Sequence, residues 1–283
     1  MTGAQAAYLA DRVRLHLNHG PIDLILWANQ AARREAYERA AARFSGLLEE
    51  LVAELPELRS PAPWDLKGPI ARRMAAAVAP FAPVFITPMA AVAGAVADAV
   101  LAAMAGAPGL SKAHVNNGGD IAFHLTPGEA VTAAVAGARA RVTLAAGQPE
   151  RGLATSGWRG RSHSLGIADA VTVLARTAAE ADAAATLIAN AVDLPGHPAV
   201  IRQPACALAP DSDLGDRLVT VDVGPLTREE AAAALDRGLA TARDFHRRGL
   251  IGAALLSLSG QSRSTGAALA SCQREPADEP EHV

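Results

Sequence analysis

Val115-Asn116-Asn117-Gly118-Gly119-Asp120-Ile121 is the most informative stretch of this chain. It places two amides, two glycines and a carboxylate between two apolar, strand-like segments, residues 112–115 and 121–125. A core strand rarely carries such a cluster, because each buried polar group needs a partner and glycine weakens a strand. Paired glycines instead indicate that something other than a side chain comes close to the backbone. The stretch therefore predicts a ligand site on a pair of strands.

Apolar periodicity predicts the elements around this stretch. Residues 13–17 alternate apolar and polar side chains and turn at His19-Gly20-Pro21 into the apolar run 22–28, which is typical of an antiparallel hairpin. We expect further strands at 140–145, 170–175, 218–223 and 250–258. We expect helices at 31–55, at 88–104 and after the capping boxes that begin at Thr177 and Thr227.

Hairpins mixed with long helices favour an α+β fold. We expect one domain over residues 1–260, in which mixed, largely antiparallel sheets pack against alanine-rich helices. Residues 261–283 are polar and end in an acidic, proline-containing segment, which is typical of a disordered tail.

Composition narrows the classes of function. Of 283 residues, 50% are hydrophobic and 4% aromatic, and the net charge of -3 gives no basic surface for nucleic acid. The apolar stretch 89–107 is mostly alanine and contains Asp98, which favours a buried helix over a membrane span. Two cysteines and an N-terminus without a signal-peptide pattern favour a cytoplasmic, enzyme-sized protein.

Asp182 and Thr186 lie four residues apart on one face of the helix that follows Thr177. Their neighbours at 181 and 183–185 are alanines, so the carboxylate and the hydroxyl project from a bare surface. Such a pair suits a hard cation such as Mg²⁺, with phosphate oxygens completing the shell. The alternative is an exposed carboxylate beside a threonine that hydrogen-bonds to its own helix. Gly94 and Asp98 share this spacing and the same ambiguity.

The loop 154–161 combines hydroxyls, a glycine, an aromatic ring and two guanidinium groups, at Thr155, Ser156, Gly157, Trp158, Arg159 and Arg161. Arginine suits phosphate and tryptophan suits stacking on a planar ring, so the loop fits a nucleotide as well as it fits a solvated surface. His163 follows at once and is a base, a ring contact or a polar loop residue. The chain contains no nucleophile elbow and no Walker-type phosphate loop.

Four motifs, taken in chain order, resemble the ApbE-like superfamily, whose characterised members are FAD:protein FMN transferases. They are Gly94-Ala95-Val96-Ala97-Asp98, Asn116-Asn117-Gly118-Gly119-Asp120, Thr155-Ser156-Gly157-Trp158-Arg159 and Ala181-Asp182-Ala183-Ala184-Ala185-Thr186. Each motif alone is weak, whereas their order and spacing over residues 85–192 are fairly specific. The two ends of the chain look more like the branch called uncharacterised protein family 0280 than like the transferases.

The resemblance implies a flavin nucleotide, FAD or FMN, bound together with Mg²⁺. It implies that Asp182 and Thr186 are metal ligands and that Val96 supplies a backbone carbonyl. It places the second and third motifs around the flavin, that is Asn116, Asn117, Gly118, Gly119, Asp120, Thr155, Ser156, Gly157 and Arg159.

The chain departs from the transferases in two places. After the Thr-Ser-Gly loop they usually carry a His-x-x-Asp-Pro-x-Thr-Gly segment, of which only His163 survives here. An aromatic residue of the first motif is replaced by Ala95. The fold and the class of ligand therefore transfer more securely than the reaction.

Three hypotheses for function follow. The leading one is a Mg²⁺-assisted enzyme that transfers a flavin phosphate group to a protein acceptor or hydrolyses it, with His163 as a weak candidate for a catalytic group. The second is a non-catalytic protein that binds a flavin or a small metabolite. The third is a hydrolase or reductase acting on another small molecule. A homodimer is one assembly open to such a chain, and we expect no nucleic-acid or membrane partner.

Overall fold

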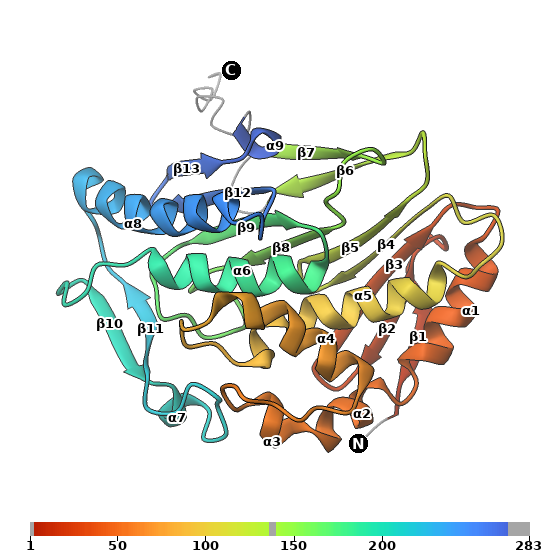
Figure 1. Ribbon diagram of the computed structural model, residues 1–283, viewed down its shortest axis with the longest axis horizontal. Coiled ribbons are helices and arrows are strands. Elements are labelled where there is room, and N and C mark those ends of the chain that lie inside the picture. The colour runs from red at the N-terminus through yellow and green to blue at the C-terminus, as the bar shows by residue number, and fades with distance from the viewer. Residues whose placement is uncertain (1–2, 136–139, 271–283) are drawn as a thin grey trace.

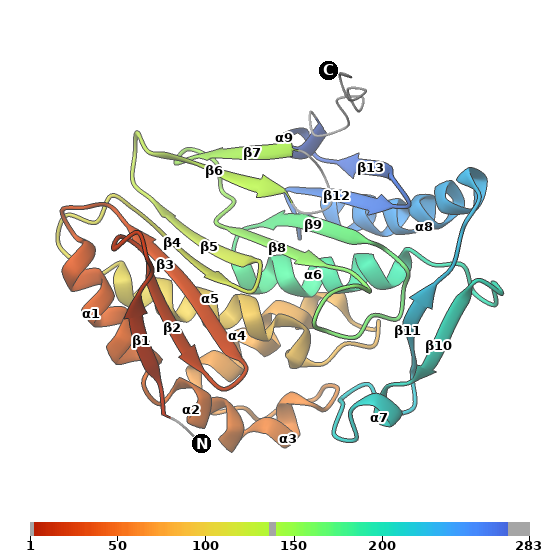
Figure 2. The ribbon, with the colours of Figure 1, turned by 180° about the vertical axis from the view of Figure 1, so that it is seen from behind.

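The computed structural model describes residues 3–135 and 140–270. A nine-stranded sheet runs through the molecule in the order β1-β2-β3-β4-β5-β8-β9-β12-β13. Neighbouring strands pair antiparallel throughout. The long helices cover one face of the sheet (Figure 1), and the opposite face shows its strands in front when the molecule is turned around (Figure 2). The predicted α+β fold is confirmed.

The strands of this sheet are β1 (Gln5–Tyr8), β2 (Leu15–His19), β3 (Ile22–Ala28), β4 (Lys112–Asn117), β5 (Asp120–Leu125), β8 (Gly152–Ser156), β9 (Ala170–Ala175), β12 (Ala253–Leu258) and β13 (Gln261–Thr265). Two separate two-stranded sheets are formed by β6 (Ala130–Val135) with β7 (Ala140–Ala145), and by β10 (Val200–Pro204) with β11 (Leu218–Val223).

The α-helices are α1 (Arg33–Phe44), α2 (Leu47–Ala53), α3 (Leu55–Leu58), α4 (Pro69–Val78), α5 (Val92–Met104), α6 (Ala178–Ala191), α7 (Ala205–Leu208), α8 (Arg228–Arg247) and α9 (Ala267–Ala270). Two short 3₁₀ helices, η1 (Ala79–Phe81) and η2 (Pro88–Ala91), precede α5. No described helix has the length and apolar character needed to cross a membrane.

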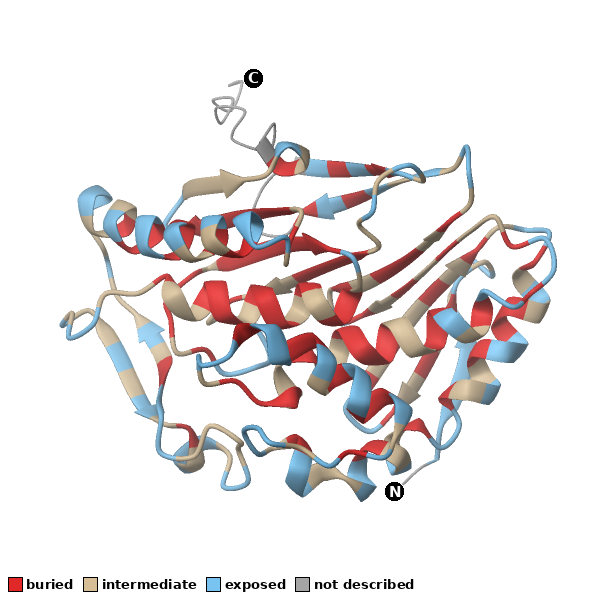
Figure 3. Cartoon of the chain, in the orientation of Figure 1, coloured by how far each residue is buried: buried red, intermediate tan, exposed pale blue. Residues whose placement is uncertain are grey.

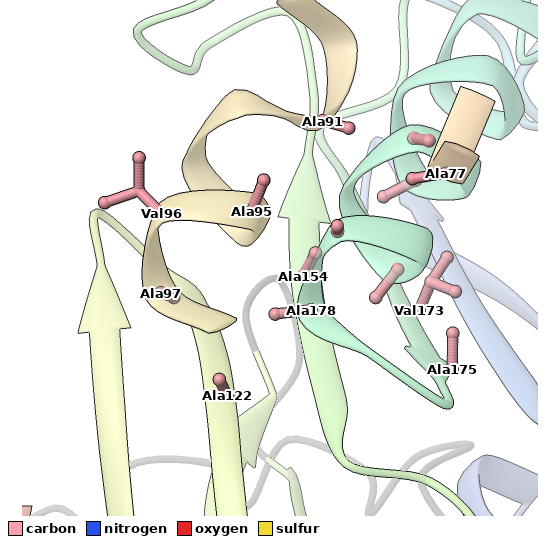
Figure 4. Packing of buried hydrophobic residues seen from close by; sticks show 14 of the residues in the cluster. Ala77, Ala91, Ala95, Val96, Ala97, Ala122, Ala154, Val173, Ala175 and Ala178 are labelled. Atoms are coloured by element: carbon pink, nitrogen blue, oxygen red, sulfur yellow. The ribbon is translucent and has the colours of Figure 1, made fainter. Parts of the chain in front are cut away.

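The core between the sheet and the helices is built from small side chains. Buried residues concentrate on α5, α6 and the strands beneath them (Figure 3). Helix α5 packs on β4 and β5, and α6 packs on β8 and β9. Small side chains such as Ala97, Ala122, Ala154 and Ala178 fill the space between these helices and strands (Figure 4). Because alanine has only a methyl group, the helix backbones lie close to each other and to the sheet.

The closest approach is between α5 and the start of α6. A Cβ atom added to Gly94 would lie 2.2 Å from the carbonyl oxygen of Ala178, and one added to Gly152 of β8 would lie 2.1 Å from the same turn, at Thr177. Real Cβ atoms do not come this near to backbone atoms. The first turn of α6 is therefore held between two glycines.

Asp98 fixes this turn electrostatically. Its carboxylate accepts hydrogen bonds from the backbone N–H groups of Ala178 (3.1 Å) and Ala179 (3.0 Å), which have no acceptor within their own helix. Thr177 accepts a third, from Glu180, as the capping motif predicts. Burial raises the pKa of Asp98, and the two backbone N–H groups oppose this rise. Asp98 is thus a cap for α6, which decides the ambiguity of its sequence context.

Two predicted helices differ from the structure. The helix expected over 31–55 is divided into α1 and α2, because Gly46 between them takes a left-handed φ of +84°. A separate short helix, α3, begins at Leu55 and contains Pro56 in its first turn. The helix expected from Pro88 starts as the 3₁₀ helix η2, and Thr87 donates to Asp213 instead of capping it.

The expected tail from residue 261 is wrong over its first ten residues. Strand β13 (Gln261–Thr265) pairs with β12, and α9 follows it. Ser259 (φ +48°) and Gly260 (φ +73°) form the two-residue turn, whose left-handed conformations suit a β-hairpin. Polar side chains do not prevent this pairing, because an edge strand pairs through its backbone alone. Residues 271–283 lie outside the described residues.

We predict that Gly94→Ala destabilises the protein by about 1–3 kcal/mol, because the added methyl group forces α5 away from α6. Urea unfolding checks this value. Gly147→Ala is the matched control, since nothing lies within 4 Å of its added Cβ and its change should stay within about 0.5 kcal/mol. Equal effects of the two substitutions would contradict the close helix contact.

Candidate functional site

The site starts at the turn between β4 and β5. Asn117 and Asp120 are directly opposite each other, and Gly118 and Gly119 connect them with φ angles of +64° and +116°. These conformations favour glycine, so both glycines are required by the turn itself. The Asn116 side chain accepts a hydrogen bond from the N–H of Gly119 (2.8 Å) and so stabilises the turn.

Two polar side chains at this turn face the helices and are buried. Asn117 is 5% exposed and donates to the carbonyl oxygen of Ala93 at the start of α5 (3.1 Å). Asp120 is 8% exposed and accepts from the N–H of Thr155 at the end of β8 (3.1 Å). The turn is therefore joined to α5 on one side and to the Thr-Ser-Gly loop on the other.

Asp182 enters the same site from α6. Its carboxylate accepts a hydrogen bond from the N–H of Gly94 (3.1 Å). Burial raises the pKa of Asp182 well above its usual value, and the negative charge of Asp120 raises it further. The two carboxylates are therefore close enough to interact although 62 residues separate them in sequence.

Burial likewise raises the pKa of Asp120, to about 7, while the Thr155 N–H and the charge of Arg161 act in the opposite direction. Neither carboxylate makes an ion pair among the described residues, and no group of three or more His, Cys, Asp or Glu that could hold a metal occurs there. A divalent cation would add positive charge next to Asp182, on which no cationic side chain is seen to act.

Thr186 lies one turn beyond Asp182 on α6 and is half-buried. In the described part of the chain its hydroxyl has no hydrogen-bond partner, so it does not bond back to its own helix. The carboxylate and the free hydroxyl on one helix face fit the hard oxygen ligands that Mg²⁺ prefers. The site has few protein ligands, which suits Mg²⁺ because this ion usually retains waters or phosphate oxygens.

The Thr-Ser-Gly loop contributes mainly through its backbone. The Thr155 hydroxyl is engaged by Thr172 (2.9 Å), while its N–H holds Asp120. Ser156 is half-buried at the end of β8. Gly157 allows the loop to touch the next strand, since an added Cβ would lie 2.5 Å from the carbonyl oxygen of Asp169.

The structure does not bring every predicted residue to this point. Arg159 is 65% exposed and pairs with Asp169 (3.3 Å) instead of a residue of the β4–β5 turn. His163 is exposed and makes no hydrogen bond within the described residues. Val96 is fully buried inside α5, and the α5 backbone groups that contact the site belong to Ala93 and Gly94. The roles of all three remain predictions.

Arg161, and not Arg159, is the arginine of this loop that reaches the β4–β5 turn. A Cβ added to Gly118 would lie 1.9 Å from its Nη2 atom, so its guanidinium rests on the β4–β5 turn. Two arginines stand in one loop, and composition does not distinguish them. One sequence feature agrees with this placement. Gly118 has no side chain and so leaves room for another group above the turn.

A family model described as AbpE bacteria matches residues 6–264. The chain belongs to this family. A "UPF0280 protein" from Methanothrix thermoacetophila is 39% identical over 155 residues, a match that covers 51% of this chain and 63% of that protein. The match therefore spans less than two thirds of the relative's length.

The fold of this AbpE bacteria family member is similar to a solved structure described as Pseudomonas stutzeri flavinyl transferase ApbE in its apo form. The TM-score is 0.51, the sequence identity is 13%, and the similarity covers 97% of this chain and 99% of the other. At this identity the likeness concerns the fold alone. Together the comparisons confirm the resemblance to the ApbE-like superfamily and to its uncharacterised 0280 branch.

We predict that metal-free protein loses stability as pH rises from about 4 to about 7. In this window the native chain, with an Asp120 pKa of about 7, binds more protons than the unfolded chain, whose aspartates titrate near 3.8. Asp120→Asn should flatten the dependence of the unfolding free energy on pH, measured by urea unfolding with a chelator present.

The exposed Asp65, whose side chain is 82% accessible, provides the control Asp65→Asn. This substitution should leave the slope unchanged. Equal slopes for the wild-type chain and Asp120→Asn would show that Asp120 ionises as easily in the folded protein as in the unfolded chain.

Proposed function

We propose that this chain binds a flavin nucleotide, FAD or FMN, together with Mg²⁺, and that it transfers or hydrolyses a flavin phosphate group. The observation that carries the proposal is the meeting of four distant segments at two carboxylates. Gly94 donates to Asp182, Asn117 donates to the carbonyl oxygen of Ala93, and Thr155 donates to Asp120. Groups whose pKa values are strongly shifted by burial, as those of Asp120 and Asp182 are, are typical of functional sites.

The metal fits the donor set of this site. Asp182 and Thr186 would hold Mg²⁺, with a backbone carbonyl near the start of α5 as a further ligand. When bound, the ion supplies Lewis acidity and neutralises the charge of a diphosphate. Asp120 would orient the ligand, while Asn117 keeps the β4–β5 turn in register with α5.

A flavin also fits the loop beyond the turn. The indole N–H of Trp158 is buried and has no hydrogen-bond partner among the described residues. Such an orphaned donor is costly unless a ligand or water accepts it. An isoalloxazine ring offers both a planar face and carbonyl oxygens, so it would match an aromatic side chain with a free donor.

The alternative is a protein that binds a flavin or small metabolite without turnover. The loss of the Asp-Pro-x-Thr-Gly segment favours it, as does the absence of a hydrogen-bond partner for His163 within the described residues. Incubation of the purified chain with FAD and Mg²⁺ separates the two functions. Release of AMP supports transfer or hydrolysis, and the flavin product, protein-bound or free, tells which. Tight binding without AMP supports the alternative, while absence of binding refutes both.

We predict that Asp182→Asn weakens Mg²⁺-dependent flavin binding at least ~10-fold, the scale of losing one charged contact. Asparagine retains an acceptor for the Gly94 N–H but lacks the charge that holds the cation. Calorimetric titration with FAD, with and without Mg²⁺, measures the change. Asp65→Asn serves again as the surface control, and an unchanged affinity in Asp182→Asn would exclude Asp182 as a metal ligand.

A further inference from the structure

The guanidinium of Arg161 occupies a defined place at the candidate site. It rests on the turn at Gly118, where an added Cβ would lie 1.9 Å from Nη2 and 3.0 Å from Cζ. Its charge also reaches Asp120, whose pKa it lowers. This arginine therefore lies at the turn next to Asp120, although its side chain is exposed to solvent.

Arg161 nevertheless has no protein partner for its N–H groups. Within residues 3–135 and 140–270 it makes no hydrogen bond and no ion pair, and its side chain is exposed. Arg159 provides the contrast in the same loop, because it pairs with Asp169 (3.3 Å) and stacks on Trp158 at 4.3 Å. Of the two guanidinium groups, the one at the turn is the one with donors available for a ligand.

The two carboxylates make the candidate site unfavourable for an anionic ligand, and the positive charge of Arg161 would offset this repulsion. When they are ionised, Asp120 and Asp182 repel any anionic group that approaches them, and a cation at Asp182 would offset only part of that repulsion. A planar guanidinium binds phosphate through two parallel N–H bonds and keeps its charge at all relevant pH values. The guanidinium of Arg161 lies at the β4–β5 turn, next to Asp120.

We propose that Arg161 binds a phosphate group of the flavin nucleotide over Gly118 and thereby selects phosphorylated flavins over riboflavin. This inference rests on the proposed function and adds its specificity-determining residue. Gly118 is then needed twice: for the left-handed turn and for the space that the guanidinium and phosphate occupy. Thr155 and Asp182 do not duplicate this role, because Thr155 is engaged by Asp120 and Thr172 and Asp182 carries a negative charge when ionised.

The test compares riboflavin, FMN and FAD as ligands of the full chain, with affinities measured by flavin fluorescence in the presence of Mg²⁺. Arg161→Ala should weaken FMN and FAD binding at least ~10-fold, as expected for a charged hydrogen bond, and leave riboflavin within about 2-fold. Arg161→Lys should fall between, because it retains the charge without the planar fork. Raising the salt concentration should weaken FMN binding more in the wild-type chain than in Arg161→Ala.

Gly118→Ala tests the same point without removing the arginine, since its Cβ would displace the guanidinium. It should also lose FMN and FAD affinity selectively. Arg34→Ala, which removes an arginine side chain that is 89% exposed on α1, should bind all three flavins as the wild-type chain does. Circular dichroism and thermal unfolding identify any variant that fails to fold.

Two failures are distinguishable. If the wild-type chain binds none of the three flavins, the proposed function fails and this inference fails with it. If the wild-type chain binds FMN and Arg161→Ala binds it equally well, or loses riboflavin to the same extent, only the role of Arg161 is refuted.

Discussion

The contact between α5 and the first turn of α6 is the constraint on which the site depends. Gly94 and Gly152 let this turn lie against both a helix and a strand, and Asp98 caps it from α5. The same approach brings the Gly94 N–H onto Asp182. The close packing of small residues between α5 and α6 therefore also fixes the position of the Asp182 carboxylate. A larger side chain at the contact would move the carboxylate away from the β4–β5 turn as well as open the core.

Burial of two carboxyl groups at the candidate site costs electrostatic free energy, which a bound cation would offset. Desolvation raises the pKa values of Asp120 and Asp182, so the metal-free protein holds two carboxyl groups in an unfavourable setting. Only backbone N–H groups and one exposed guanidinium offset this cost in the described chain. Ligand and cation binding would then gain free energy that folding has given up, which is a common trade between stability and function.

Much of the fold could be predicted from the sequence, because alternation and capping act locally. The hairpin of β2 and β3, the strands beside Gly118 and the start of α6 at Thr177 follow from such patterns. The break at Gly46 and the strand β13 could not be predicted in this way. The φ angle of a glycine and the backbone pairing of an edge strand produce no pattern of apolar side chains. In the site, motifs pointed to Asp120 and Asp182, but the choice between Arg159 and Arg161 depended on which of them tertiary contacts had already engaged.

The hairpin of β12 and β13 also positions the Thr-Ser-Gly loop. Asp169, which pairs with Arg159, accepts a hydrogen bond from the N–H of Ser259 in the hairpin turn (2.8 Å), and its own N–H donates to Ser257. An expression boundary drawn at Gly260, as the polar sequence invites, would remove the sheet's last strand and loosen the anchor of a loop more than a hundred residues earlier. The C-terminal hairpin thus supports the candidate site from a distant part of the sequence.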